Sequence, residues 1–309
     1  MIKIESLTRS FGRFTAVDGI SFMVSPGEVL GFLGPNGAGK STTMKILTGF
    51  LEATSGTVSV MGHDVANEPK AVQALVGYLP EGAPLYGDMT VRGFLNFIGQ
   101  ARGFRGDELK QRVSSVVQKV QLSRVLDQTI DTLSKGFKRR VGLAQAIIHD
   151  PKVLVLDEPT DGLDPNQKHQ VRELIRNLSK DKIVIISTHI LEEVSAVCTR
   201  ALILASGKVV FDGTPDALSR LSRHHNAIAI KLAAQQDAAS ALSAIDGVAS
   251  VDSDPQTGSF IVYPLNGMSL LREVNQVIHR NGWDVEELHV EKGRLDDVFR
   301  QVTLEGVST

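Results

Sequence analysis

Residues 34–41 read Gly34-Pro35-Asn36-Gly37-Ala38-Gly39-Lys40-Ser41, and this run decides the fold. It matches the pattern G-x-x-x-x-G-K-[S/T]. The run follows an apolar segment at Val29–Leu33 that predicts a buried strand. It opens a segment at Ser41–Thr48 with the apolar spacing of a helix. A strand, glycine-rich loop and helix in this order form the setting in which such a loop binds phosphate groups.

The loop's residue types explain this chemistry. Glycines let backbone N–H groups curl around phosphate oxygens, and the helix N-terminus adds a partial positive charge. Lys40 can reach the β- and γ-phosphates, and the Ser41 hydroxyl can ligate Mg²⁺. We therefore expect ATP and Mg²⁺ as ligands. The predicted phosphate-binding residues are Gly34, Pro35, Asn36, Gly37, Ala38, Gly39, Lys40, Ser41 and Thr42.

A second apolar segment, Val153–Leu156, runs into the acidic pair Asp157 and Glu158. Two adjacent carboxylates at the end of a buried strand are costly to desolvate unless cations accompany them. We expect Asp157 to hold Mg²⁺, directly or through water, and Glu158 to orient and deprotonate the attacking water. Taken alone, the pair is equally compatible with a strand that enters a solvated turn. The phosphate loop is what favours the catalytic interpretation.

Further motifs in the same order resemble those of ABC ATPases. Leu133-Ser134-Lys135-Gly136-Phe137 resembles the family's signature motif, usually Leu-Ser-Gly-Gly-Gln, and Asp161-Gly162-Leu163-Asp164 resembles its D-loop. His189 follows a predicted strand at Ile183–Ser187, as the family's switch histidine does, and Phe11 lies where its adenine platform lies. The resemblance covers roughly residues 1–221.

The resemblance implies a fold and a mechanism. The fold is α/β: a P-loop ABC nucleotide-binding domain with a helical subdomain at about 91–150. The mechanism needs a second copy of the chain, packed head to tail, so that the signature motif of one copy faces the ATP of the other. Phe11 would stack on adenine, His189 would bind the γ-phosphate and position the water, and Asp164 would signal across the dimer. Ser134, Lys135 and Gly136 would complete the site from the partner copy.

Two positions depart from the family pattern. Glu81, in Gly77-Tyr78-Leu79-Pro80-Glu81, stands where the family usually has a glutamine that touches Mg²⁺ and the attacking water. Its carboxylate adds negative charge near the γ-phosphate and can still ligate Mg²⁺ through oxygen. Lys135 replaces the signature's first glycine; it either adds positive charge at the γ-phosphate or points to solvent.

Composition narrows the class of partner. The chain carries 33 basic and 35 acidic residues, a net charge of -2, without the basic excess typical of nucleic-acid binders. No run approaches the roughly 18 apolar residues of a membrane span, and the N-terminus lacks the features of a signal peptide. The single cysteine, Cys198, rules out an internal disulfide and is expected to be a small core residue. These features predict a cytoplasmic protein without nucleic acid as a partner. The resemblance to ABC ATPases implies that it is peripheral at the cytoplasmic face of the inner membrane, held there by a permease.

The sequence predicts two domains, 1–221 and 226–309, joined by a polar, aperiodic linker around Leu218–Asn226. Residues from Asn226 onward hold 6 basic and 12 acidic side chains, a net charge of -6. Their apolar patterns indicate strand, helix, two strands, helix, strand and a final helix. The βαββαβ order predicts a small C-terminal α+β ferredoxin-like domain. Its role as an accessory domain is regulatory or dimer-stabilising, unless it is a passive extension.

The resemblance also indicates the kind of transporter. The segment Gly77–Thr90 resembles ABC-2-type exporter ATPases, and looks closest to the gliding-motility-associated type. Leu295-Asp296-Asp297-Val298-Phe299 resembles the closing segment of such exporters. One nucleotide domain per chain without a membrane segment implies separate ABC-2-type permease subunits. These would dock near Glu81 and the helices after Val91.

Several alternatives remain open on sequence alone. A soluble ABC ATPase acting on ribosomes or nucleic acid is the second function class, although such proteins usually carry two nucleotide domains, an inserted coiled coil or a basic extension. The cations after the signature are expected to form a solvated helix face: Lys138, Arg139 and Arg140. Four apolar residues belong equally to a permease contact or to the subdomain core: Phe94, Leu95, Phe97 and Ile98.

Overall fold

The computed structural model describes residues 1–82, 84–233, 238–254 and 257–305, with the side chains of 304 and 305 left aside. Its contacts divide the chain into two compact units, which are described separately. The first holds Met1–Gly213 and the C-terminal residues from Thr303, and the second holds Thr214–Val302. The linker that the sequence placed at 218–226 lies inside the second unit.

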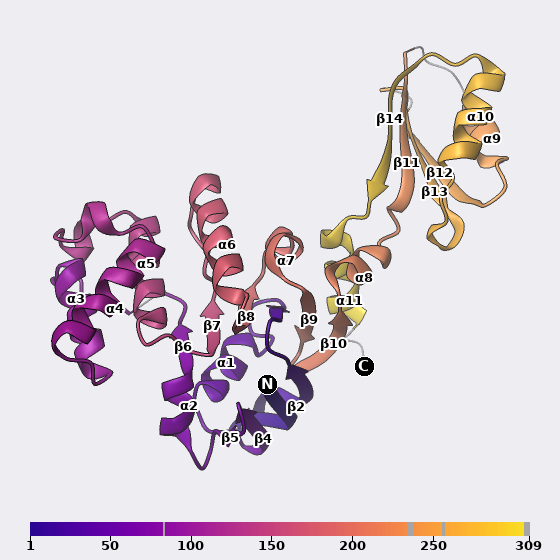
Figure 1. Cartoon of the computed structure of the whole chain (residues 1–309). Helices are drawn as coiled ribbons and strands as arrows, with labels where there is room; N and C mark the ends of the chain where they lie inside the picture. Colours follow the sequence, from indigo (N-terminus) through magenta and orange to yellow (C-terminus); the bar gives the residue numbers. More distant parts are fainter. Residues whose placement is uncertain (83, 234–237, 255–256, 306–309) are drawn as a thin grey trace. The chain divides into compact units, whose positions relative to one another are not determined.

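The first unit begins with an antiparallel sheet in the order β2-β1-β4-β5 (Figure 1). The sequence pattern predicts a strand only at Ile2–Leu7. β1 runs four residues further, because its pairing with β2 continues to a hairpin tip where Phe11 lies opposite Phe14. Antiparallel partners supply the hydrogen bonds that the weak apolar pattern of this segment did not predict. The strands are β1 (Ile2–Phe11), β2 (Phe14–Val24), β4 (Ser55–Val60) and β5 (His63–Asp64).

The second sheet has six strands in the order β10-β9-β3-β8-β7-β6. The strands from β9 to β6 are parallel, and β10 pairs antiparallel with β9 at the edge. Every residue of β3, β7 and β8 is buried, as expected for central strands covered on both faces. The strands are β3 (Val29–Leu33), β6 (Val76–Leu79), β7 (Val153–Asp157), β8 (Ile183–Thr188), β9 (Arg200–Ala205) and β10 (Lys208–Gly213).

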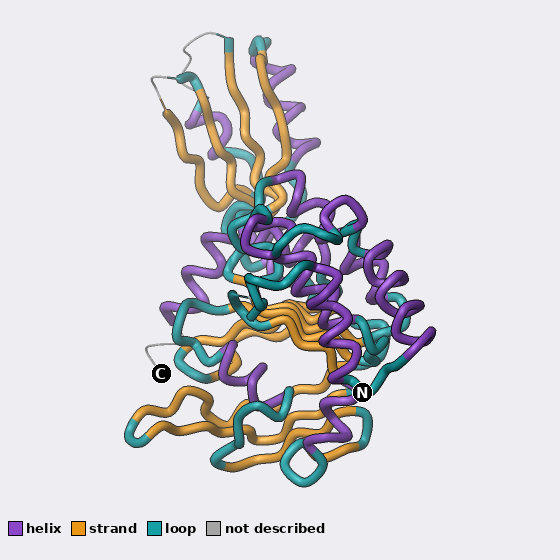
Figure 2. Tube along the Cα trace, turned by 90° about the vertical axis from the view of Figure 1, so that its left-hand side faces the viewer, coloured by secondary structure: helices purple, strands orange, loops and turns teal. Residues whose placement is uncertain are grey.

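Helix α1 (Lys40–Leu47) lies between these two sheets and contacts strands of both (Figure 2). One apolar cluster fills the space around it, with Met44, Leu47 and Phe32 almost fully buried. A second cluster covers the opposite face of the six-stranded sheet. The phosphate loop is therefore held between two packed layers. The other helices around this core are α2 (Pro69–Leu75), α6 (Pro165–Ser179) and α7 (Leu191–Val197).

The predicted helical subdomain is present between β6 and β7. It contains α3 (Val91–Ala101), α4 (Gly106–Lys119), α5 (Lys135–Ile147) and two short 3₁₀ segments, η1 (Ser123–Val125) and η2 (Ile130–Thr132). Phe94 and Leu95 are buried in its core, whereas Phe97 is 44% exposed. The structure thus assigns the first two residues to the core and leaves Phe97 on the surface.

The second unit has the predicted βαββαβ order and an antiparallel sheet in the order β12-β13-β11-β14. This is the ferredoxin-like arrangement. Helices α9 and α10 cover an apolar cluster that includes Ile230, Val262 and Val274. The elements are α8 (Pro215–Arg220), β11 (His225–Leu232), α9 (Ala239–Ser243), β12 (Val248–Asp254), β13 (Ser259–Pro264), η3 (Leu265–Gly267), α10 (Leu271–Asn281), β14 (Val285–Lys292) and α11 (Leu295–Glu305).

Part of the predicted linker proved wrong. Residues 218–220 close the helix α8, and Leu218 is fully buried. The Thr214 side chain accepts a hydrogen bond from the Ala217 N–H at 3.1 Å, and Pro215 occupies the first turn. This cap stabilises a helix too short to show apolar periodicity. The predicted start of the next helix, Asp237, lies outside the described residues. None of the helices in the described part of the chain has the length and apolarity to span a bilayer.

Candidate active site

Four segments that the sequence singled out meet at the carboxyl edge of the six-stranded sheet. The adjacent strands β3, β8, β7 and β6 are parallel, so their carboxyl ends lie along the same edge. In open α/β sheets, ligands bind outside this edge. The segments are the phosphate loop (34–41) after β3, His189 after β8, Asp157 and Glu158 at the end of β7, and Glu81 after β6.

The phosphate loop requires glycine for steric reasons. Gly39 has a φ of +105° directly before α1, and a Cβ there would lie 2.4 Å from the Ala16 carbonyl oxygen. A Cβ at Gly34, whose φ is +155°, would lie 2.5 Å from the Leu204 carbonyl oxygen. Backbone approaches this close exclude any other residue. They bring the N-terminus of α1 to the sheet edge, where its first N–H groups can meet an anion.

Lys40 is held inside this loop by the loop's own backbone. Its Nζ donates hydrogen bonds to the carbonyl oxygens of Gly34, at 2.6 Å, and Pro35, at 3.1 Å. Only 7% of Lys40 is exposed, and desolvation lowers its pKa. The negative charges of Glu158, Asp157 and Glu81 oppose that shift.

The acid loop (157–164) follows β7 and is held by the neighbouring strand β8. Asp157 is 2% exposed and accepts a hydrogen bond from the Ser187 hydroxyl. The Glu158 N–H donates to the same hydroxyl at 3.1 Å and to the Ser187 carbonyl oxygen at 3.2 Å. Glu158 has a φ of +49°, which is uncommon for a residue other than glycine and often marks functional sites. Ser187 therefore anchors the start of the acid loop, from which both carboxylates project.

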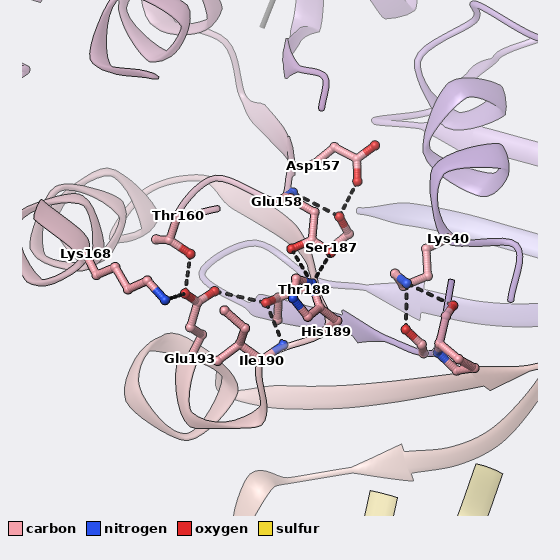
Figure 3. A network of polar contacts seen from close by, with 12 residues as sticks. Lys40, Asp157, Glu158, Thr160, Lys168, Ser187, Thr188, His189, Ile190 and Glu193 are labelled. Carbon is pink, nitrogen blue, oxygen red and sulfur yellow. Dashed lines mark hydrogen bonds and ion pairs between the residues drawn. The ribbon is translucent and has the colours of Figure 1, made fainter. Parts of the chain in front are cut away.

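Glu158 and His189 form a pair across the ends of β7 and β8 (Figure 3). The His189 Nδ1 lies 3.0 and 3.1 Å from the two carboxylate oxygens of Glu158. Desolvation raises the pKa of Glu158, and the bond and charge of His189 lower it, as does Lys40. The net shift is upward, so this carboxylate is a better proton acceptor than an exposed one.

Arg139 contradicts the prediction of a solvated helix face. It is 8% exposed and points from α5 into the acid loop. It donates to the carbonyl oxygens of Pro159, at 3.2 Å, of Asp157, at 3.0 Å, and of Glu158. Burial lowers its pKa, but three carbonyl acceptors and the nearby carboxylates compensate for the lost hydration. No local pattern predicts this burial, because the acceptors come from a loop about 20 residues away.

The other two cations of this group fit the surface prediction better. Lys138 and Arg140 are half-buried on α5. Lys138 lies 3.4 Å from Asp131, and the Arg140 guanidinium lies over the Phe137 ring. These two side chains cover the helix surface with their stems while their charges reach polar partners.

Glu81 is exposed and borders a cavity of about 840 Å³ between the end of β6 and the helical subdomain. The cavity is mostly apolar. The Tyr78 hydroxyl is buried in this region without a hydrogen-bond partner among the described residues, and burial raises its pKa. The lining includes Lys45, Phe50, Tyr78, Glu81, Ile98 and Arg102.

The signature residues lie at the start of α5. Ser134 is its N-cap, and its hydroxyl accepts a hydrogen bond from the Phe137 N–H at 3.4 Å. Ser134 and Lys135 are exposed, while Gly136 is buried where a Cβ would lie 2.5 Å from the Gln167 amide. In the described part of the chain, no hydrogen bond or ion pair joins residues 134–136 to the phosphate loop. The structure does not bring these two predicted parts together within one copy.

Two further predicted residues occupy positions at the ends of elements. Asp164 is the N-cap of α6 and accepts a hydrogen bond from the Gln167 N–H at 2.9 Å. Phe11 ends β1 at a hairpin tip and is 46% exposed, with the Arg9 guanidinium 4.6 Å from its ring centroid. An exposed ring backed by a cation is suited to stacking on a flat ligand.

The sequence did not indicate four residues of this region: Ser187, Arg139, Thr160 of the acid loop, and Glu193, whose buried carboxylate accepts a hydrogen bond from Thr160. One feature of the sequence could have indicated Ser187. It is a polar residue near the end of an apolar strand, and in the parallel sheet it lies opposite Asp157. Glu193 follows His189 by four residues. This spacing indicates one helical turn but does not predict that the carboxylate is buried. The described residues contain no cluster of three or more histidine, cysteine or acidic side chains typical of an all-protein metal site.

Comparisons with known proteins agree with this site. The ABC transporter family model matches residues 17–161. The Nod factor export ATP-binding protein I of Paraburkholderia xenovorans is 37% identical over 218 residues, 70% of this chain and 72% of that protein. The linearmycin resistance ATP-binding protein LnrL of Bacillus subtilis is 36% identical over 223 residues, 72% of each.

A solved ATP binding subunit of an ABC transporter matches in three dimensions with a TM-score of 0.65 and 30% identity. The match covers 72% of this chain and 92% of that one. The relatives' identity and coverage establish the family, and the phosphate loop with the carboxylates beside it agrees with this. The chain belongs to the ABC transporter family as an ATP-binding subunit, and it is an ATPase.

Proposed function

We propose that two copies of this chain bind two ATP molecules head to tail and thereby power export through separate ABC-2-type permease subunits. The observation that carries the proposal is the meeting of Lys40, Asp157, Glu158 and His189 at one sheet edge, with Ser134 and Lys135 of the signature exposed elsewhere. The site as it stands in one chain lacks the N-terminal turn of α5. A second copy can supply that turn.

The residues divide the hydrolytic work among themselves. Lys40 neutralises charge on the β- and γ-phosphates, because an anionic oxygen is a stronger acceptor than the two carbonyls that it now contacts. Glu158, with its raised pKa, takes the proton of the attacking water. His189, held 3.0 Å from Glu158, binds the γ-phosphate and keeps the water in line. Phe11 stacks on the adenine.

The chain offers suitable ligands for Mg²⁺. Mg²⁺ is usually bound by one or two carboxylates together with substrate phosphates and waters, so an all-protein cluster is not needed. The buried Asp157 carboxylate and the Ser41 hydroxyl supply oxygen at the edge where the phosphates would lie, and Glu81 adds a third oxygen donor. Held by these residues, Mg²⁺ would neutralise the negative charge that develops on the phosphate oxygens during hydrolysis.

The signature turn suits a role in the partner's site. Ser134 caps α5 and leaves its N-terminal end facing solvent, where helix N–H groups and a hydroxyl can meet a γ-phosphate. Lys135, in place of a glycine, adds a positive charge at this end. Gln167 lies beside Gly136, and its N–H donates a hydrogen bond to Asp164. Asp164 is therefore near the same surface. The D-loop and the signature turn are therefore joined through Gln167.

Export and a membrane partner rest on other observations. Relatives are named for Nod factor export, for linearmycin resistance and, at 37% identity, as a probable multidrug ABC transporter ATP-binding protein in Escherichia coli. The mostly apolar cavity beside Glu81 and Ile98 supports a permease docking site that would hold the chain at the cytoplasmic face of the inner membrane. The gliding-motility-associated type rests on the segment 77–90 alone, which includes residue 83, outside the described residues. No observation favours action on ribosomes or nucleic acid.

The test compares the wild-type chain with Glu158→Gln and Lys40→Ala. Glu158→Gln keeps the shape of the side chain and loses the base. We expect it to bind ATP, to dimerise with ATP in size-exclusion chromatography with light scattering, and to hydrolyse ATP at least about 100-fold more slowly than wild type. Lys40→Ala should bind ATP about 100-fold or more weakly, and should not dimerise at ATP concentrations that saturate the wild type. Wild-type turnover by Glu158→Gln would remove Glu158 from the role of base, and an ATP-bound monomer would contradict the head-to-tail site.

The second unit is proposed as an accessory domain that regulates or stabilises the dimer. Its acidic charge and its independent apolar core support a separate role. The test is a chain that ends after Gly213, and so also lacks the residues from Thr303, compared with the full chain in ATP-dependent dimerisation and in turnover. Equal values for the two chains would make the unit a passive extension.

A further inference from the structure

A buried carboxylate, Glu193 of α7, lies behind the catalytic pair and has no place in the mechanism above. It is 4% exposed. Its Oε2 accepts a hydrogen bond from the Thr188 hydroxyl at 3.0 Å, and its Oε1 accepts one from the Thr160 hydroxyl. Thr160 lies two residues after Glu158, and Thr188 directly precedes His189. One carboxylate therefore joins the two segments that carry the catalytic pair.

These links close into a ring (Figure 3). From Glu158 the backbone leads to Thr160, a hydrogen bond leads to Glu193, another leads to Thr188, and the backbone leads on to His189. The His189 Nδ1, 3.0 Å from Glu158, completes the circuit. The Thr188 hydroxyl also accepts the Ile190 N–H at 3.0 Å, which fixes the turn on the far side of the histidine.

The cost of burying this carboxylate indicates why a positional role suits it. A buried carboxylate is stable only with hydrogen bonds and nearby cations. Here two hydroxyls donate, while Lys168 and Arg172 of α6 lie 4.0 Å from Oε1, too far for short direct bonds. Two apolar side chains in place of Glu193 and Thr160 would pack without this cost. The polar arrangement instead specifies a geometry, because each hydrogen bond has a direction and a length.

We propose that Glu193 is a positioning residue that sets the separation of Glu158 and His189 and couples the acid loop to the histidine. It does not touch ATP. A movement of the acid loop, which continues to Asp164, would pass through Thr160 and Glu193 to the turn that holds His189. The proposal rests on the proposed hydrolytic roles of Glu158 and His189.

The experiment uses the full-length purified chain and four variants: Glu193→Ala, Glu193→Gln, Thr160→Val and the neighbouring Glu192→Ala as a matched control. Glu192 is 82% exposed and lies 4.0 Å from Arg172. We expect Glu193→Ala to lower kcat about 10- to 100-fold, the loss typical of a misplaced catalytic group, and to leave the Kd for ATP within about threefold. Thr160→Val should show a smaller loss of the same kind, and Glu192→Ala none.

Glu193→Gln separates position from folding. Its amide oxygen can accept from Thr188, and its NH₂ can donate to Thr160, since a threonine hydroxyl is both donor and acceptor. We expect it to restore at least half of the kcat that Glu193→Ala loses, with a thermal unfolding midpoint near that of wild type. A fall in the unfolding midpoint and in ATP binding together with kcat, without rescue by glutamine, would assign Glu193 a structural role only.

A double-mutant cycle with His189→Ala tests the route of the effect. If Glu193 acts through the histidine, the double variant should be hardly slower than His189→Ala alone. Additive losses would show that Glu193 acts elsewhere and overturn the proposal. Failure of the wild-type chain to hydrolyse ATP would instead concern the proposed function, so the two failures are distinguishable.

Discussion

The phosphate loop and the acid loop lie at the same sheet edge but are held in place in different ways. The phosphate loop is one continuous run, and Lys40 is held by the carbonyl oxygens of Gly34 and Pro35 within that run. The acid loop is held by side chains from other elements: Arg139 of α5, Ser187 of β8 and Glu193 of α7. The phosphate loop is thus held by backbone contacts, its own and those of the strands beside it, whereas the acid loop is held by side chains from other elements.

The difference has a physical origin. A phosphate is bound mainly by backbone N–H groups, so the phosphate loop needs a backbone shape, which glycines and one helix supply locally. A general base must be placed to within a fraction of an ångström of its water, and a loop alone is too pliable for that. We therefore expect damage to the phosphate loop to abolish ATP binding, and damage to the acid loop's supports to slow turnover without loss of binding.

The largest effect should come from Lys40→Ala. The loss of a charge-assisted contact to the β- and γ-phosphates is expected to weaken ATP binding by about 100-fold or more, measured by titration with a fluorescent ATP analogue. Lys3→Ala is the control, since Lys3 is exposed and paired with Glu5 on the first sheet. Normal ATP affinity in Lys40→Ala would mean that the loop's backbone suffices.

Arg139→Lys should have the next largest effect. Lysine keeps the charge but lacks the planar fork that reaches the carbonyl oxygens of Pro159, Asp157 and Glu158 together. We expect kcat to fall about 10- to 100-fold with ATP affinity retained. Arg140→Lys, one residue along the same helix and directed to Gln121 and Gln170, should lose much less. Equal losses in the two variants would show that the acid loop does not depend on Arg139.

Glu81→Gln tests a residue that belongs to neither the phosphate loop nor the acid loop. Glu81 is exposed, and glutamine retains one oxygen that can ligate Mg²⁺. We expect turnover to stay within about tenfold of wild type, a barrier change of at most about 1.4 kcal/mol. Complete loss of ATPase activity would show that this chain requires the carboxylate.

The smallest effect concerns the pH dependence of turnover. Burial raises the pKa of Glu158, and His189 lowers it in part. Turnover needs the carboxylate unprotonated, so it should fall as the pH drops through this raised pKa. In His189→Ala the lowering contribution is gone, so the acidic limb of the residual kcat profile should move to higher pH. An unchanged limb would indicate that another group controls it.

The sequence predicted the central fold and most of the site because those features repeat local patterns. Continuous apolar runs at Val29–Leu33, Val153–Leu156 and Ile183–Ser187 indicated strands buried on both faces, and all three are central strands. The βαββαβ order of the second unit was likewise predicted from the alternating apolar patterns of its segments. The short helix α8 was not predicted, because six residues are too few to show an apolar periodicity. The helix depends on its N-terminal cap.

The sequence itself determined the shape of the phosphate loop, the order of the motifs and the adjacency of Asp157 and Glu158, because each of these depends on neighbouring residues. Only the tertiary structure decided that Arg139 is buried, that Ser187 anchors both carboxylates and that Glu193 joins Thr160 to Thr188. The reason is that these contacts cross from one element to another. Their partners are chosen by the strand order β3-β8-β7-β6 and by helix packing, which no local pattern encodes.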